Sequence, residues 1–217
     1  TIISKIVDDV KQELNGKDLV LADGFSGSGI IARLFKIKGV SLHVNDIAGY
    51  SQTLNKCYLS TPTTKQQKRI EKLIAKANKF AYSEDTIKYD KWIQLHWAPS
   101  GNITKDQRVY YTEKNGKLID RYRSFINSLS ENDKPFILAP LLVEASIHNN
   151  TNGQFSAFYK DEQGVGKFGG KKEIDIKRIT TPIKLPLPIF SPSPCNVNVS
   201  RMDTNQWIKD IPEVDLV

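Results

Sequence analysis

The fold of this chain is predicted by one stretch, Leu19-Val20-Leu21-Ala22-Asp23-Gly24-Phe25-Ser26-Gly27-Ser28-Gly29. A short apolar run ends in an acid, Asp23, and a loop with three glycines separates that acid from a helix expected to begin near Ile30. Glycine adopts positive φ and lets a ligand approach the main chain closely. Strand, glycine loop and helix in this order predict the start of an α/β nucleotide-binding unit. A plain tight turn is the alternative.

A second predicted strand, residues 40–46, also ends in an acid. Asp46 lies 23 residues after Asp23, close to the separation of about 20 residues at which nucleotide-binding sheets place an acid on ribose hydroxyls. The loop departs from the dinucleotide pattern because it begins with an acid, which would repel a pyrophosphate. A cationic ligand with a free amine suits Asp23 better, and S-adenosylmethionine, which has no phosphate, is such a ligand. A nucleotide-dependent oxidoreductase is the disfavoured alternative.

The glycine loop has the form D-x-F-x-G-[ST]-G, and Asn45-Asp46 follows at the end of the next predicted strand. Further blocks of the sequence are His96-Trp97-Ala98-Pro99, Tyr110-Tyr111-Thr112, Leu142-Val143-Glu144-Ala145-Ser146 and Gly166-Lys167-Phe168-Gly169-Gly170. Together these motifs resemble the adenine-specific DNA methyltransferases, in particular the D12-class bacterial modification methylases. Many methyltransferases share the glycine loop, so the later blocks make the resemblance specific.

The resemblance implies an enzyme that methylates the exocyclic amine of adenine in duplex DNA, in a restriction–modification system or as an orphan modification methylase. It implies S-adenosylmethionine as the cofactor, with its amino acid portion on the glycine loop and its ribose on Asp46. Asp203 matches the acid that contacts the adenine amino group of the cofactor, and helix capping is the alternative role for this residue. The loop residues implied in cofactor binding are Asp23, Gly24, Phe25, Ser26, Gly27, Ser28 and Gly29.

The chain departs from this family in one respect. The family holds its target adenine with an Asp-Pro-Pro-Tyr motif after a strand, and residues 213–217 resemble that strand without the motif. The chain also begins at Thr1, without a methionine. We therefore expect a fragment, truncated before the motif and inactive alone, and we name no catalytic residue. A cofactor- and DNA-binding subunit of a split methyltransferase, which needs a partner chain for the motif, is the alternative.

The predicted fold class is α/β, with an incomplete Rossmann-like methyltransferase sheet and a largely helical insertion. Residues 1–59 and 183–217 are expected to form two parts of the methyltransferase core, and residues 60–182 an inserted region that recognises the DNA target. Residues 81–115 are expected to be rich in loops, and residues 149–170 to form hairpins or mobile loops. Expected helices cover residues 2–14, 49–59, 64–80, 118–129 and 206–208, and expected strands include 197–199 and 214–217.

Lysines beside the glycine-rich segment of the insertion are the candidate DNA contacts. They are Lys160, Lys167, Lys171 and Lys172. A helix over residues 64–80 also carries six basic residues, which either follow DNA phosphates or form a solvated face. Aromatic residues of the insertion either stack on bases or pack in the core. These are Trp92, Trp97, Tyr110 and Tyr111.

Composition limits the remaining function classes. Lys and Arg number 31 against 24 Asp and Glu, and the net charge of +7 suits a polyanionic partner such as double-stranded DNA. The two cysteines, Cys57 and Cys195, are far apart in sequence, which disfavours a disulfide framework or zinc site and fits a reducing cytoplasm. The three histidines show no metal-ligand spacing, so no metal is expected. No stretch has the length and apolar character of a membrane span.

Overall fold

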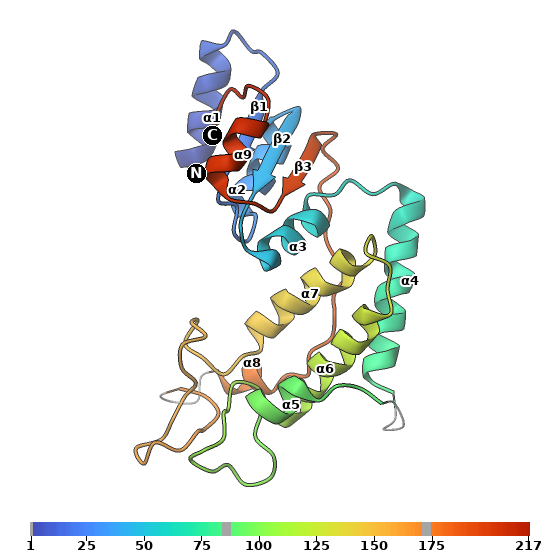
Figure 1. Cartoon of the computed structure of the whole chain (residues 1–217), viewed down its shortest axis with the longest axis vertical. Helices are drawn as coiled ribbons and strands as arrows, with labels where there is room; N and C mark the ends of the chain where they lie inside the picture. The colour runs from blue at the N-terminus through green and yellow to red at the C-terminus, as the bar shows by residue number, and fades with distance from the viewer. Residues whose placement is uncertain (1, 84–87, 171–174) are drawn as a thin grey trace. The chain divides into compact units, whose positions relative to one another are not determined.

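The computed structural model describes residues 2–83, 88–170 and 175–217. The chain forms two compact units, each described by itself (Figure 1). The first unit comprises Thr1–Lys68 and Pro188–Val217, and the second comprises Arg69–Leu187. The first unit is therefore discontinuous in sequence, and the second unit lies between its two parts along the chain.

The first unit is built on a parallel sheet of three strands, β1 (Val20–Asp23), β2 (Ser41–Asn45) and β3 (Asn196–Ser200), in the order β1-β2-β3. Both strand pairs are parallel, so the three carboxyl ends lie at one edge. The segment predicted as a strand at residues 214–217 contributes an isolated parallel bridge between Leu216 and Leu21 rather than a strand. This bridge lies on the side of β1 away from β2. A mixed α/β fold with a parallel sheet is confirmed.

Helices α1 (Ile2–Glu13), α2 (Ile30–Lys38), α3 (Gly49–Tyr58) and α9 (Thr204–Asp210) complete the first unit. Its core joins the apolar side chains of α1 and α2 to those of β1 and β2. Val7, Leu21, Phe35 and Leu42 are members of this core. Burial of large apolar side chains stabilises the fold by roughly 1.5–3 kcal/mol each, which fixes the strand ends that carry Asp23 and Asp46.

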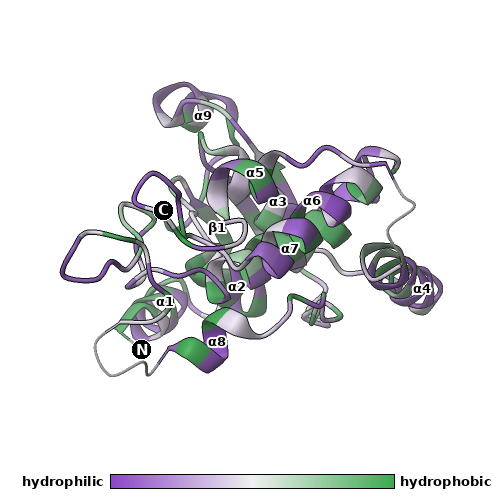
Figure 2. Cartoon of the chain, turned by 90° about the horizontal axis from the view of Figure 1, so that it is seen from below, coloured by the Kyte–Doolittle hydropathy of each residue, from purple (hydrophilic) through white to green (hydrophobic). Residues whose placement is uncertain are grey.

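The second unit is mainly helical. It contains most of α4 (Thr64–Ala81), together with α5 (Trp92–Trp97), α6 (Glu113–Asn127), α7 (Lys134–Ile147) and α8 (Ile176–Thr180). Hydrophilic and hydrophobic residues both occur along α4 (Figure 2). The expectation of a largely helical insertion therefore agrees with the architecture of this unit.

Two details of the second unit were not predicted from the sequence. The described part of residues 81–115 is rich in loops, as expected, but it also contains α5, whose first N–H groups at Ile93 and Gln94 donate to the Asp120 carboxylate (3.0 and 2.8 Å). A distant residue thus caps a helix too short to show a periodic pattern. Helix α6 begins at Glu113 rather than near residue 118, because Thr112 caps it by accepting from the Asn115 N–H.

Candidate cofactor site and DNA-recognition region

The glycine loop after β1 has the backbone shape that its glycines predict. Gly27 and Gly29 have φ of 50° and 78°, in the left-handed region that favours glycine. The Ser26 N–H donates to the carbonyl of Asn45 (3.1 Å), and the Gly29 N–H donates to the carbonyl of Ser26 (2.7 Å). The loop is therefore tied to the end of β2 before α2 begins.

A cluster of buried hydrogen bonds from α3 holds the glycine loop. The Asn55 amide donates to the hydroxyl of Ser26 (2.9 Å) and to the carbonyl of Ser51 (2.9 Å), and the two serine hydroxyls are 3.1 Å apart. A Cβ on Gly29 would lie 2.3 Å from Oδ1 of Asn55, so only glycine fits there. The sequence analysis did not predict this role for Asn55.

Asp46 lies beside the glycine loop, as its position at the end of β2 predicts. One carboxylate oxygen, Oδ2, accepts from the Gly27 N–H (2.8 Å), and the other accepts from the Ala48 N–H (2.8 Å). A carboxylate has about four acceptor positions, so these two bonds leave room for hydroxyl donors. The two acids proposed from sequence thus share one edge of the sheet, and ribose binding by Asp46 stays a prediction.

Asp23 has an unsatisfied acceptor. Its Oδ2 is buried and has no hydrogen-bond partner among the described residues. Burial raises the pKa of the Asp23 carboxyl, and the nearby Asp46 carboxylate raises it further, while the N–H groups of Phe25 and Ala32 oppose the shift. A buried unpaired carboxylate oxygen is costly. The site therefore fits a ligand that brings a cationic donor, such as an ammonium group.

Asp203 has the helix-capping role that was the alternative considered from the sequence. It is the N-cap residue of α9, and its carboxylate accepts from the Asn205 N–H (2.9 Å). The hydroxyl of the next residue, Thr204, donates to the carbonyl of Gly24 (2.9 Å). Asp203 is exposed, so the capping role leaves its predicted contact with the cofactor's adenine untested.

Asn45 is a functional candidate that sequence reasoning missed. This fully buried residue ends β2, and its amide donates to the Met202 carbonyl (3.0 Å) and to the Thr204 hydroxyl (3.3 Å). Its Oδ1 accepts from the Met202 N–H (3.1 Å). The side chain therefore links the ends of β2 and β3, and through Thr204 it also reaches the loop after β1.

Large apolar side chains are exposed around this edge of the sheet. Phe25 in the glycine loop is 82% exposed, and Ile47, directly after Asp46, is 69% exposed. Tyr50 at the start of α3 is 54% exposed. Exposed apolar groups beside polar ligand contacts are typical of a site for a flat ring. Of these residues only Phe25 was predicted, because no spacing rule marks the other two.

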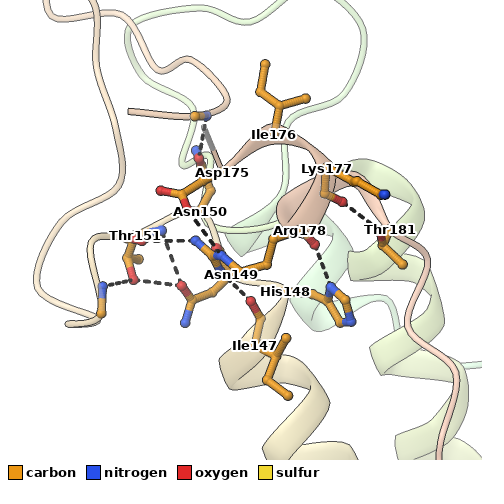
Figure 3. A network of polar contacts seen from close by, with 12 residues as sticks. Ile147, His148, Asn149, Asn150, Thr151, Asp175, Ile176, Lys177, Arg178 and Thr181 are labelled. Carbon is orange, nitrogen blue, oxygen red and sulfur yellow. Dashed lines mark hydrogen bonds and ion pairs between the residues drawn. The ribbon is translucent and has the colours of Figure 1, made fainter. Parts of the chain in front are cut away.

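In the second unit, residues of 147–151 and of 175–181 form a network of polar contacts (Figure 3). The guanidinium of Arg178 donates to the carbonyls of Ile147, Asn149 and Thr151. The fully buried Asn150 donates to the carbonyls of Val109 (2.7 Å) and Lys167 (2.8 Å) and accepts from the Gly169 N–H (3.0 Å). Side chains thus satisfy the backbone of a segment that has little regular structure.

The glycine-rich segment held by this network carries the predicted DNA contacts. Isolated antiparallel bridges join Thr151 to Phe158 and Lys160 to Gly166, in agreement with the expected hairpins. Lys160 and Lys167 are exposed. The predicted contacts Lys171 and Lys172 lie outside the described residues. Binding of DNA by these lysines stays a prediction.

The aromatic residues of the second unit pack mainly within it. Tyr110 and Tyr111 are buried, and the Tyr110 ring contacts those of Trp97 and Phe155 at centroid distances of 4.8 and 6.0 Å. Trp92 is 46% exposed. Of the two roles considered from sequence, core packing is therefore the observed one for both tyrosines.

Among residues 2–83, 88–170 and 175–217, no group of three or more His, Cys, Asp and Glu side chains could hold a metal ion. None of the helices in these ranges combines the length and the apolar character needed to cross a membrane.

The fold and the candidate site define an α/β protein in which an acid-first glycine loop and a second-strand acid share one edge of a parallel sheet. The chain belongs to the D12 class N6 adenine-specific DNA methyltransferase family, whose sequence profile matches residues 2–173. The resemblance inferred from its motifs is thereby confirmed.

A curated relative is the Type II methyltransferase M.NlaIII of Neisseria lactamica, which is 28% identical to the chain over 200 residues. The match covers 89% of this chain and 53% of the relative, so the chain spans about half of the relative's length. No solved structure matches the chain significantly.

Proposed function

We propose that this chain provides the cofactor-binding and DNA-binding parts of an S-adenosylmethionine-dependent methyltransferase that acts on the exocyclic amine of adenine in DNA, within a type II restriction–modification system. The observation that carries the proposal is the buried, unpartnered Oδ2 of Asp23 beside a glycine loop bonded to Asp46. A cationic amino acid ligand would satisfy that oxygen, whereas a pyrophosphate would be repelled by it. Family membership supports the same conclusion.

The residues present fit this cofactor as follows. Asp23 would accept from its ammonium group, and the loop from Gly24 to Gly29 would let its amino acid portion approach the main chain. Asp46 would accept from the ribose hydroxyls with the acceptor positions that Gly27 and Ala48 leave open. Asp203 would contact the adenine amino group. The sheet would then be the first part of a Rossmann-like methyltransferase core, with the ligand beyond the carboxyl ends of its strands.

When bound, S-adenosylmethionine supplies the methyl group, so the protein contributes mainly position and electrostatics. The target amine cannot reach a cofactor pocket from inside a duplex, so the base must leave the stack. The 217 residues contain no Asp-Pro-Pro-Tyr sequence, and we assign no catalytic residue among them. The proposal for this chain is therefore cofactor and DNA binding, and it places the lysines of the glycine-rich segment, Lys160, Lys167, Lys171 and Lys172, on the DNA.

Calorimetric titration with S-adenosylhomocysteine and, separately, with NAD tests the cofactor assignment. We expect saturable binding of S-adenosylhomocysteine only. Asp46→Ala should weaken it by roughly 1.5–3 kcal/mol, about tenfold or more, because charge-assisted hydrogen bonds to the ribose are lost.

Asp18→Ala, which removes an exposed acid of the same unit, is the control and should bind like the wild type. Thermal melting of each variant separates lost affinity from lost folding. Saturable NAD binding without S-adenosylhomocysteine binding would overturn the proposal, and unchanged affinity in Asp46→Ala would remove Asp46 from the site.

A further inference from the structure

Helix α4 carries a row of basic residues on one side. Within the second unit these are Arg69, Lys72, Lys76 and Lys79, and we call them the basic row. At 3.6 residues per turn their side chains fall within an arc of about 80°, and the row rises roughly 15 Å along the axis. All four residues are exposed. The earlier turns of the same helix continue this spacing with Lys65 and Lys68.

The opposite side of α4 is buried in the protein. Its buried residues are Ile70, Ile74, Ala77 and Ala81. Glu71, the acid on this helix, lies about 80° around the axis from the nearest member of the basic row. The helix therefore presents positive charge along one line and has no free apolar face.

Internal ion pairs leave most of the basic row available. Arg69 pairs with Asp133 at 2.5 Å, although its side chain remains 65% exposed. Lys72, Lys76 and Lys79 have no ion pair with any described residue. Three like charges on successive turns repel one another, so a solvated row without a partner is mildly destabilising, and a partner with regularly spaced negative charges would relieve that repulsion.

We propose that the basic row is a contact surface for the phosphate backbone of duplex DNA. A linear polyanion matches a straight row of cations, and lysine contacts to phosphates release counterions. An anionic membrane fits less well, because a helix that lies on a membrane buries its own apolar face in the lipid, and the apolar face of α4 is already packed. This inference rests on the proposed function for its partner, duplex DNA, and adds a surface that binds DNA irrespective of sequence.

The test compares two triple variants that remove the same charge. One is Lys72→Gln, Lys76→Gln and Lys79→Gln, which removes the three lysines of the row that have no ion pair among the described residues but keeps helix propensity, since Gln and Lys are similar helix formers. The control replaces three exposed lysines of other helices, Lys5 in α1, Lys114 in α6 and Lys209 in α9, by Gln. The affinity of each protein for a labelled mixed-sequence duplex is measured by fluorescence anisotropy over a series of potassium chloride concentrations.

For the row variant we expect the slope of log association constant against log salt concentration to become less negative by about three, roughly one for each lost phosphate contact. The control should keep the wild-type slope. Equal slopes for wild type and row variant would overturn the inference while leaving DNA binding intact. A wild type that does not bind the duplex would overturn both this inference and the DNA part of the proposed function. Loss of binding to phosphatidylserine vesicles in the row variant, with DNA binding unchanged, would instead assign the row to a membrane surface.

Discussion

The two units both use buried asparagines to hold the loops of their candidate sites, but they depend on them to different degrees. Asn45 in the first unit and Asn150 in the second are each fully buried, and each makes three hydrogen bonds through its amide group. Asn45 ends a strand that is already paired on both sides. Asn150 lies where only isolated bridges occur nearby.

In the second unit, further asparagine side chains bind backbone groups that strand pairing would satisfy in a sheet. Asn115 donates to the carbonyls of Ile179 and Thr181, and Asn78 donates to the carbonyl and accepts from the N–H of Leu185. These amides satisfy the backbone of a returning segment that has no strand partner. Backbone pairing in the sheet therefore positions the candidate cofactor site, whereas side-chain amides position the candidate DNA-recognition region.

We expect Asn150→Asp to give the largest loss of stability, and this substitution tests directly whether side-chain amides hold the second unit together. A carboxylate there cannot donate to the carbonyls of Val109 and Lys167, and it would place negative charge beside both oxygens. We expect a loss of stability on the order of 3 kcal/mol or more, since buried groups are left unpaired. Urea unfolding followed by tryptophan fluorescence measures it.

Asn45→Asp is the matched substitution in the first unit. We expect it to cost less, about 1–2 kcal/mol, because the strand pairing persists and the Thr204 hydroxyl can turn to donate to the new carboxylate. The Met202 carbonyl then lacks its donor, and the Gly24 carbonyl loses the hydroxyl proton that Thr204 now gives it. If the two variants lose equal stability, the distinction between the units drawn from their backbone pairing is wrong.

The difference in stability between two glycine substitutions, about 1–2 kcal/mol, separates backbone strain from side-chain packing within the first unit. Gly29→Ala adds a Cβ at 2.3 Å from Oδ1 of Asn55 in a left-handed conformation, whereas Gly27→Ala meets nothing within 4 Å. We expect about 1 kcal/mol for Gly27→Ala from backbone strain alone. Gly29→Ala should cost roughly 2–3 kcal/mol, because Asn55 must also give up hydrogen bonds to Ser26 and Ser51.

Thermal melting of the two alanine variants gives the difference directly. Equal losses would mean that Asn55 can move at little cost and that backbone conformation alone holds the loop. A larger loss of stability for Gly29→Ala would show that the first unit also depends on a buried asparagine, Asn55. The contribution of Asn55 could then be compared with that of Asn150.

The sequence predicted the parts of the fold that depend on neighbouring residues. The apolar run, the acid and the glycines specify β1, the loop and α2 locally, and Asp46 follows from the end of the next strand. The roles of Asn45 and Thr204 depend on partners more than 150 residues away. No period in the sequence records such pairings, so they could not be predicted.

Contacts between residues far apart in sequence also explain why parts of the second unit could not be predicted. Helix α5 is stabilised by Asp120 in α6, and the glycine-rich segment by Asn150 and Arg178. Sequence reasoning identified the exposed lysines of that segment but treated its glycines as a source of mobility. Gly166 instead packs where a Cβ would lie 2.3 Å from the Val109 side chain, which is a structural reason for glycine.

The smallest expected effect is a pH dependence confined to the first unit. Burial raises the pKa of Asp23 above its ordinary value, so this carboxyl takes up a proton at a higher pH than an exposed aspartate. The ionised form is the one that attracts an ammonium group. Affinity for S-adenosylhomocysteine should therefore fall as pH is lowered through the raised pKa, by up to about tenfold per pH unit. The folded state itself gains stability over the same range, because it binds that proton more tightly than the unfolded chain.

Calorimetry from neutral pH into the acidic range, where the ligand's amine stays protonated, measures this dependence, and Asp23→Asn should bind weakly with a flatter profile. An equal pH dependence in Asp23→Asn would assign the titration to a group other than Asp23. The acid that begins the glycine loop would then not be the group that recognises the ligand's amine.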